Sequence, residues 1–91
     1  MLEIEVRGIP CLFNENALDD FEMLEKLEQM ESGNITAMVG FARGIFGEEQ
    51  LDNIKTQLRG EDGICKLSDV SDFIGECMQA AAEKKKVELK N

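Results

Sequence analysis

The chain has 91 residues, of which 19 are Asp or Glu and 10 are Lys or Arg, and its formal net charge is -9. It contains no histidine, which removes the commonest general base, and its negative charge disfavours binding to nucleic acid or to anionic lipids. A hydrophobic content of 43% is too high for a disordered acidic tail, and the length fits one domain over residues 1–91.

Residues 1–13 predict a small β-hairpin. The run Leu-Glu-Ile-Glu-Val at residues 2–6 alternates apolar and acidic side chains, which is typical of a strand with one buried face. Arg-Gly-Ile-Pro at residues 7–10 is typical of a turn, and residues 11–13 are expected to return as the second strand.

Residues 16–86 are expected to form a helical body of about four short helices, so that the fold class is mainly α. The first helix follows helix-starting side chains at residues 14–16 and ends at the Ser-Gly pair of residues 32–33. Glu22 is expected to pair with Lys26. The apolar stripe of this first helix has one residue at every third position. It consists of Leu18, Phe21, Leu24, Leu27 and Met30.

Two further helices are expected over residues 35–46 and 48–58, with Gly47 between them. Gly40 and Gly44 lie inside the first of these. Each glycine costs up to about 1 kcal/mol relative to Ala in a helix, so the two predict close packing against another helix or a break.

A turn at residues 61–63 and a short extended piece at residues 64–67 precede the fourth expected helix. Ser68 is its predicted N-cap, and the lysines at residues 84–86 complement the dipole at its end. Residues 87–91 are expected to form a flexible tail. The apolar stripe of the fourth expected helix consists of Val70, Phe73, Ile74, Cys77, Met78 and Ala81.

The core is expected to be aliphatic, because five Phe are the only aromatic residues. Two locations are considered for four of the methionines. Met23, Met30, Met38 and Met78 are expected in the core, and the alternative is a surface that adapts to partners.

No metal site is predicted. Residues 60–64 resemble the middle of a calcium-binding loop with its central glycine. If Gly63 took the sixth position, however, Leu58 and Gly60 would take the first and third, and neither has a side-chain oxygen.

Cys11, Cys65 and Cys77 are odd in number, widely spaced and without a CxxC pair, which fits a reduced, cytoplasmic protein. Without histidine they match neither a zinc site nor a catalytic thiol. They are expected to be small core residues. No apolar run approaches the roughly 20 residues that cross a bilayer.

Adjacent carboxylates occur at residues 19–20, 48–49 and 61–62, where helix dipoles and solvation explain them. General acid and base chemistry requires carboxyls that converge on a pocket, and adjacent pairs predict no such convergence. The glycines of the middle region lack the GK[ST] of a phosphate loop. The lysines at residues 84–86 are expected to be a solvated helix end. We therefore expect no enzyme and no cofactor.

Four stretches follow one another along the chain: LEIEVRGIPCLF, the acidic LDDFEMLEKLEQM, ARGIFGEEQLDNIKTQLRG, and KLSDVSDFIGECMQAAAEK before a lysine-rich end. In size and in the order of these elements, over nearly its whole length, the chain resembles the tail assembly chaperones of long-tailed (siphovirus-type) phages and prophages. This resemblance rests on element order and on loosely matching phrases such as FGEEQLDNIKTQL, without a catalytic motif.

The resemblance implies a non-enzymatic protein that acts in the cytoplasm of the host bacterial cell and is absent from the mature virion. Such a protein binds the tape measure protein and assists assembly of the tail tube protein around it, without a cofactor, nucleic acid or membrane. It also implies a longer product made by ribosomal frameshifting, for which the lysines at residues 84–86 are a candidate slippery position.

Two other classes remain as alternatives. One is an acidic regulatory or decoy protein that binds a basic protein surface, because nine acidic residues from Glu3 to Glu31 meet only Arg7 and Lys26. The other is a small structural homo-oligomer.

Overall fold

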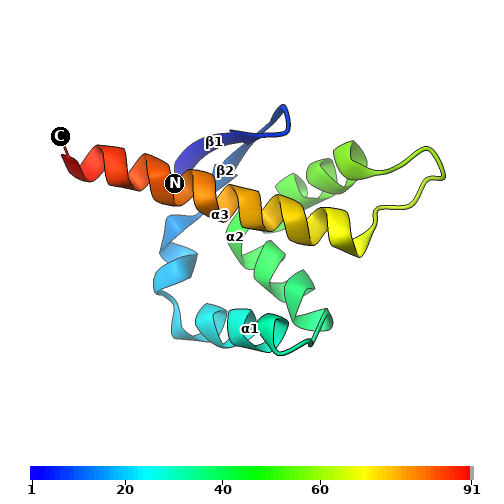
Figure 1. The fold of residues 1–91 in the computed structure, drawn as a ribbon, viewed down its shortest axis with the longest axis horizontal. Helices are drawn as coiled ribbons and strands as arrows, with labels where there is room; N and C mark the ends of the chain where they lie inside the picture. The colour runs from blue at the N-terminus through cyan, green and yellow to red at the C-terminus, as the bar shows by residue number, and fades with distance from the viewer. Residues whose placement is uncertain (91) are drawn as a thin grey trace.

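The computed structural model describes the backbone of residues 1–90 and the side chains of residues 1–84. The described residues form a hairpin and three α-helices, where about four helices were predicted (Figure 1). The elements are β1 (Leu2–Val6), β2 (Ile9–Phe13), the 3-10 helix η1 (Glu15–Asp19), α1 (Phe21–Glu31), α2 (Thr36–Leu58) and α3 (Leu67–Lys90).

The connection between the two strands has only two residues, Arg7 and Gly8. Both have positive φ, 55° and 77°, as a type I′ turn requires. The predicted turn over residues 7–10 was too long, because Ile9 and Pro10 already belong to β2. Glu5 and Pro10 form the second residue pair from the turn, and in a hairpin of this kind that pair makes no hydrogen bonds between the strands. Pro10, which has no N–H, therefore fits at this position.

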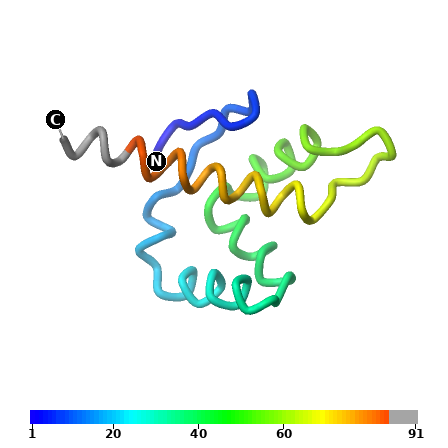
Figure 2. The backbone as a smooth tube through the Cα atoms, viewed as in Figure 1, coloured from blue at the N-terminus to red at the C-terminus, as the bar shows by residue number. Residues whose placement is uncertain are grey.

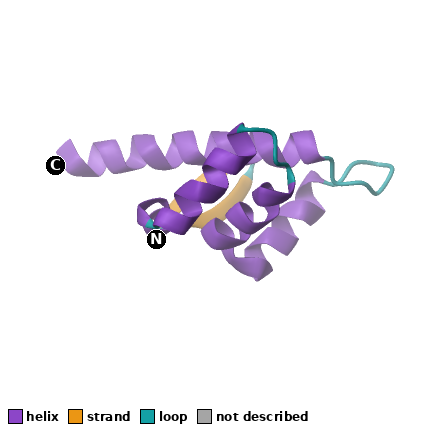
Figure 3. Cartoon of the chain, turned by 90° about the horizontal axis from the view of Figure 1, so that it is seen from below, coloured by secondary structure: helices purple, strands orange, loops and turns teal. Residues whose placement is uncertain are grey.

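One face of the hairpin is buried, as the alternation predicted. α3 contacts β1 and α2 contacts β2. Figure 3 shows the strands among the helices that cover them. The buried face consists of Leu2, Ile4, Val6, Ile9, Cys11 and Phe13.

Gln50 of α2 covers the free edge of β2. Its Oε1 accepts from the Leu12 N–H at 2.7 Å, and its Nε2 donates to the Leu12 carbonyl at 3.0 Å and to the Phe46 carbonyl at 2.9 Å. The amide thereby makes the two bonds that a neighbouring strand would make, and it connects the edge to α2.

The predicted first helix is two elements. Asn14 caps η1 by accepting from the Asn16 N–H at 3.2 Å. The chain then extends at Asp20, which starts α1 by accepting from the Glu22 N–H at 2.9 Å. α1 ends as predicted, with Ser32 at its C-cap.

The predicted apolar stripe is right for Leu27 and Met30, which pack against the core, and wrong for the first turn of α1. Met23 is buried and Leu27 and Met30 are half-buried, whereas Phe21 is 74% and Leu24 47% exposed. With 3.6 residues per turn, a strict three-residue repeat rotates by about 60° at each step, so the predicted stripe winds around the helix. The core instead selects residues spaced by four and three.

The glycines of α2 allow α1 to pack closely, as predicted. A Cβ at Gly44 would stand 2.4 Å from the Cε of Met23, and one at Gly40 would stand 3.4 Å from the Cε of Lys26. The predicted pair of Lys26 with Glu22 is wrong, because the lysine stem lies against α2.

α2 bends sharply at Gly47, whose φ of 78° and ψ of 162° are not helical (Figure 2). This region of backbone space is essentially restricted to glycine. The predicted break at Gly47 is confirmed, and the two predicted helices are the arms of α2, residues 36–46 and 48–58. They count as one helix, which accounts for the difference in number.

α3 begins at Leu67, so Ser68 lies in its first turn and is not the N-cap. The Lys66 carbonyl accepts from the Val70 N–H at 3.1 Å, which starts the helix earlier. The residues before Leu67 are not assigned as a strand. α3 extends to Lys90, beyond the predicted end at residue 86. Residues 87–91 were expected to form a flexible tail; the backbone of residues 87–90 continues α3, and residue 91 lies outside the described residues.

The core is mainly aliphatic, as expected, and its most deeply buried side chains include three phenylalanines. Phe13, Phe41 and Phe73 are fully buried, and Phe46 lies between two of them. Its ring centroid is 6.2 Å from that of Phe13 and 6.2 Å from that of Phe73. Four of the five phenylalanines are buried, because large apolar side chains gain most from burial.

We expect Gly47→Ala to lower the free energy of unfolding by about 1–3 kcal/mol, because Ala is strained at this φ and ψ although no atom lies within 4 Å of the added Cβ. Urea unfolding measures the change. Gly75→Ala is the matched control, since Gly75 lies in α3 with equally open space. That change should stabilise by about 0.5–1 kcal/mol. Equal effects of the two would contradict the strained bend.

We expect Gln50→Ala to cost about 1 kcal/mol and to speed hydrogen exchange at the Leu12 amide, because that amide loses its acceptor. Gln57→Ala, on the same arm and exposed, should leave both quantities unchanged. Unchanged exchange at Leu12 in Gln50→Ala would show that the side chain does not protect the edge.

Candidate functional site

An apolar groove lies between the two arms of α2 and the beginning of α3. Two hollows of about 220 and 240 Å³ adjoin there, because both are lined by Met38 and Leu67. The groove is lined by Met30, Ile35, Met38, Val39, Ala42, Arg43, Leu51, Lys55, Cys65, Leu67, Ser68, Val70 and Ser71.

The bend at Gly47 positions the walls of this groove. Met38 and Val39 come from the first arm of α2, and Leu51 comes from the second. Three of the large exposed hydrophobic side chains, Ile35, Val39 and Leu67, gather along it. Contiguous exposed apolar surface of this kind is typical of a site that another molecule covers.

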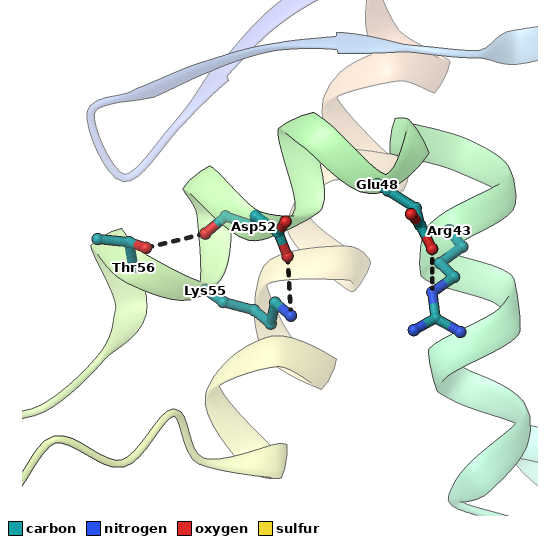
Figure 4. A network of polar contacts seen from close by, with 5 residues as sticks. All are labelled: Arg43, Glu48, Asp52, Lys55 and Thr56. Carbon is teal, nitrogen blue, oxygen red and sulfur yellow. Dashed lines mark hydrogen bonds and ion pairs between the residues drawn. The ribbon is translucent and has the colours of Figure 1, made fainter.

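The charge of the groove is opposite to that of the chain. Its charged lining residues are Arg43 and Lys55, whereas the net charge of the protein is -9. The Nε of Arg43 lies 3.4 Å from a Glu48 carboxylate oxygen across the bend, and the Nζ of Lys55 lies 3.0 Å from Asp52 (Figure 4).

Both ion pairs are largely exposed, and pairs of this kind contribute at most about 1 kcal/mol. A bound partner can therefore replace Glu48 and Asp52 with carboxylates of its own. The groove fits an apolar surface flanked by acidic side chains.

The four methionines expected in the core differ in burial, and two of them line the groove. Met23 and Met38 are buried, as expected of core residues, whereas Met30 and Met78 are half-buried. Met30 and Met38 also line the groove. Flexible thioethers in such a wall allow it to adapt to different apolar surfaces.

The cysteines also fall into two environments. Cys11 of β2 and Cys77 of α3 are buried core residues, as predicted, and their thiols influence each other's pKa. Burial raises the pKa of both thiols, and the negative charge of Glu76 adds to the effect at Cys77. Cys65 is only half-buried and lines the groove, so its predicted place in the core is wrong.

The predicted carboxylate pairs do not converge on a pocket. Asp20 caps α1, Glu48 pairs with Arg43, and Asp62 accepts from the Ile64 N–H at 3.0 Å within the predicted polar turn. Among the described residues, no three Cys, Asp or Glu side chains are grouped so that they could hold a metal ion. In the same part of the chain, no helix meets the length and hydropathy needed to cross a membrane.

The lysine cluster at residues 84–86 is described only in part. The Nζ of Lys84 donates to the Glu3 carbonyl, which connects α3 to β1. The side chains of residues 85 and 86 lie outside the described residues.

The groove was not found from the sequence, because its walls come from segments as distant as Met30 and Ser71 and depend on the angle of one bend. The available signals were Gly47 and the apolar residues Ile35 and Val39 close together at the start of α2.

Comparisons with protein-family models, curated proteins and solved structures gave no match for this chain. The resemblance to tail assembly chaperones therefore stays a prediction.

We expect the stability of the fold to decrease as the pH rises above about 9. The ordinary pKa of a thiol is 9.0, and burial raises the pKa of Cys11 and Cys77 in the folded state. Between the unfolded and folded pKa values only the unfolded chain loses these protons, which favours unfolding. Urea titrations across this pH range measure the decrease. Cys77→Ala should flatten it and Cys65→Ala should not; equal slopes would contradict the assignment.

Proposed function

We propose that this protein is a non-enzymatic assembly chaperone that binds an amphipathic helix of a partner protein in the apolar groove. The observation that carries the proposal is the gathering of exposed apolar side chains around two adjoining hollows, with Arg43 and Lys55 among them. An amphipathic helix fills such a groove with residues spaced by three and four.

The resemblance to tail assembly chaperones supplies the partner in this proposal. The tape measure protein of a long-tailed phage is long and helical, and it needs cover for its apolar stripes before the tail tube protein surrounds it. In this proposal the chaperone acts in the cytoplasm of the host bacterium and does not enter the mature virion. Its many carboxylates keep the complex in solution.

The acidic outer side of α1 supports the second candidate, a regulatory or decoy protein that binds a basic surface. Glu22, Glu25, Glu28 and Glu31 are exposed, and within the described residues none of them forms an ion pair. The two candidates differ in salt dependence. Binding in an apolar groove persists at high salt, whereas binding between an acidic helix and a basic surface weakens strongly.

Co-expression with a phage tape measure protein, the partner that this proposal assigns, tests the first candidate. We expect the wild-type chain to keep that protein soluble and to co-purify with it. Val39→Glu should weaken the complex at least about tenfold, because it places a charge in the apolar wall.

Ile64→Glu is the matched control, since Ile64 is an exposed hydrophobic residue outside the groove lining. This variant should bind as the wild type does. If the tape measure protein is equally soluble with and without the wild-type chain, the chaperone proposal is wrong; if Val39→Glu binds normally, the groove is not its site.

A further inference from the structure

α1 has a second apolar face, opposite the one that it buries. At about 100° per residue, Phe21, Leu24, Glu25 and Glu28 fall within one sector roughly 100° wide, on the side away from Met23. Phe21 is 74% exposed, although the other four phenylalanines are buried. Among the side chains that the structure describes, neither packing nor capping explains an exposed phenylalanine at that position.

The charges of this outer face match the apolar groove. Glu25 and Glu28 are exposed and form no ion pair among the described residues. The face thus combines two apolar side chains with two available carboxylates. The groove combines apolar walls with Arg43 and Lys55, whose present partners are exposed and exchangeable.

We propose that the outer face of α1 in one copy of the chain binds in the apolar groove of a second copy. Phe21 and Leu24 contact the walls, and Glu25 and Glu28 face the two cations of the groove. One contact covers the exposed phenylalanine of one molecule and the exposed apolar groove of the next.

This contact joins two different surfaces, so each added copy leaves one face and one groove open at the ends. Contacts of this kind produce a closed ring or an open filament. The inference rests on the proposed function in using the same groove, since a partner helix competes with α1 of the neighbouring copy and ends the assembly.

Sedimentation velocity from micromolar to millimolar concentration tests the contact. The wild type and Ile64→Glu should associate with increasing concentration. Phe21→Glu and Val39→Glu should each raise the dissociation constant at least about tenfold. Circular dichroism confirms that both variants fold, which their exposed positions favour. An equimolar mixture of the two keeps one intact contact, so it should form one-to-one dimers and nothing larger.

A charge exchange provides a second test. Glu25→Lys with Glu28→Lys should weaken association. Glu61→Lys with Glu83→Lys changes the net charge equally at two exposed positions outside α1 and the groove lining, and it should not weaken association. A monomeric wild type at millimolar concentration, or normal association of Phe21→Glu, would overturn the inference.

The two proposals fail separately. Phe21→Glu keeps its groove and should still bind the tape measure protein. If Phe21→Glu associates normally and Val39→Glu no longer binds the tape measure protein, only the proposed self-association is refuted. Normal binding of that protein by Val39→Glu, with loss of self-association, refutes the proposed site alone.

Discussion

The fold depends on the contact of Phe46 with Phe13 on one side and Phe73 on the other. These three rings join β2, α2 and α3, with Phe13 and Phe46 in an edge-to-face arrangement at 87°. Such pairs contribute about 0.5–1.5 kcal/mol beyond the burial of their area. The Asn14 N–H also donates to the Ile45 carbonyl at 3.1 Å, so the end of β2 is held against α2 beside the central ring.

The groove depends on this contact because Gly47 directly follows Phe46. The core fixes the first arm of α2 up to the ring, and the glycine then directs the second arm away at an angle that other residues rarely adopt. Arg43 and Glu48 connect the two arms across the bend (Figure 4). The packing of Phe46 therefore fixes where the bend lies, and the bend leaves the apolar groove uncovered.

The hairpin, the bend and the end of α1 were predictable, because each follows from local chemistry. The two-residue period of β1, the freedom of Gly47 and the Ser-Gly stop after α1 act within a few residues. The inward face of α1 was predicted correctly at Leu27 and Met30 and wrongly at its first turn, since Met23 and Phe21 both lie there and either offered burial. The neighbouring helix α2 decides which face is buried, because the small Gly44 leaves room for Met23.

The sequence by itself determined the hairpin, the bend at Gly47, the acidic character of the chain and the absence of histidine-based chemistry. These features follow from composition and from short-range periodicity, which do not depend on how distant segments pack. Only the tertiary structure decided which apolar side chains stay exposed, that Arg43 and Lys55 share a groove, and that Phe21 lies on an open face. These features depend on the angles at which distant segments pack, and such angles are set by side-chain volumes across the whole core.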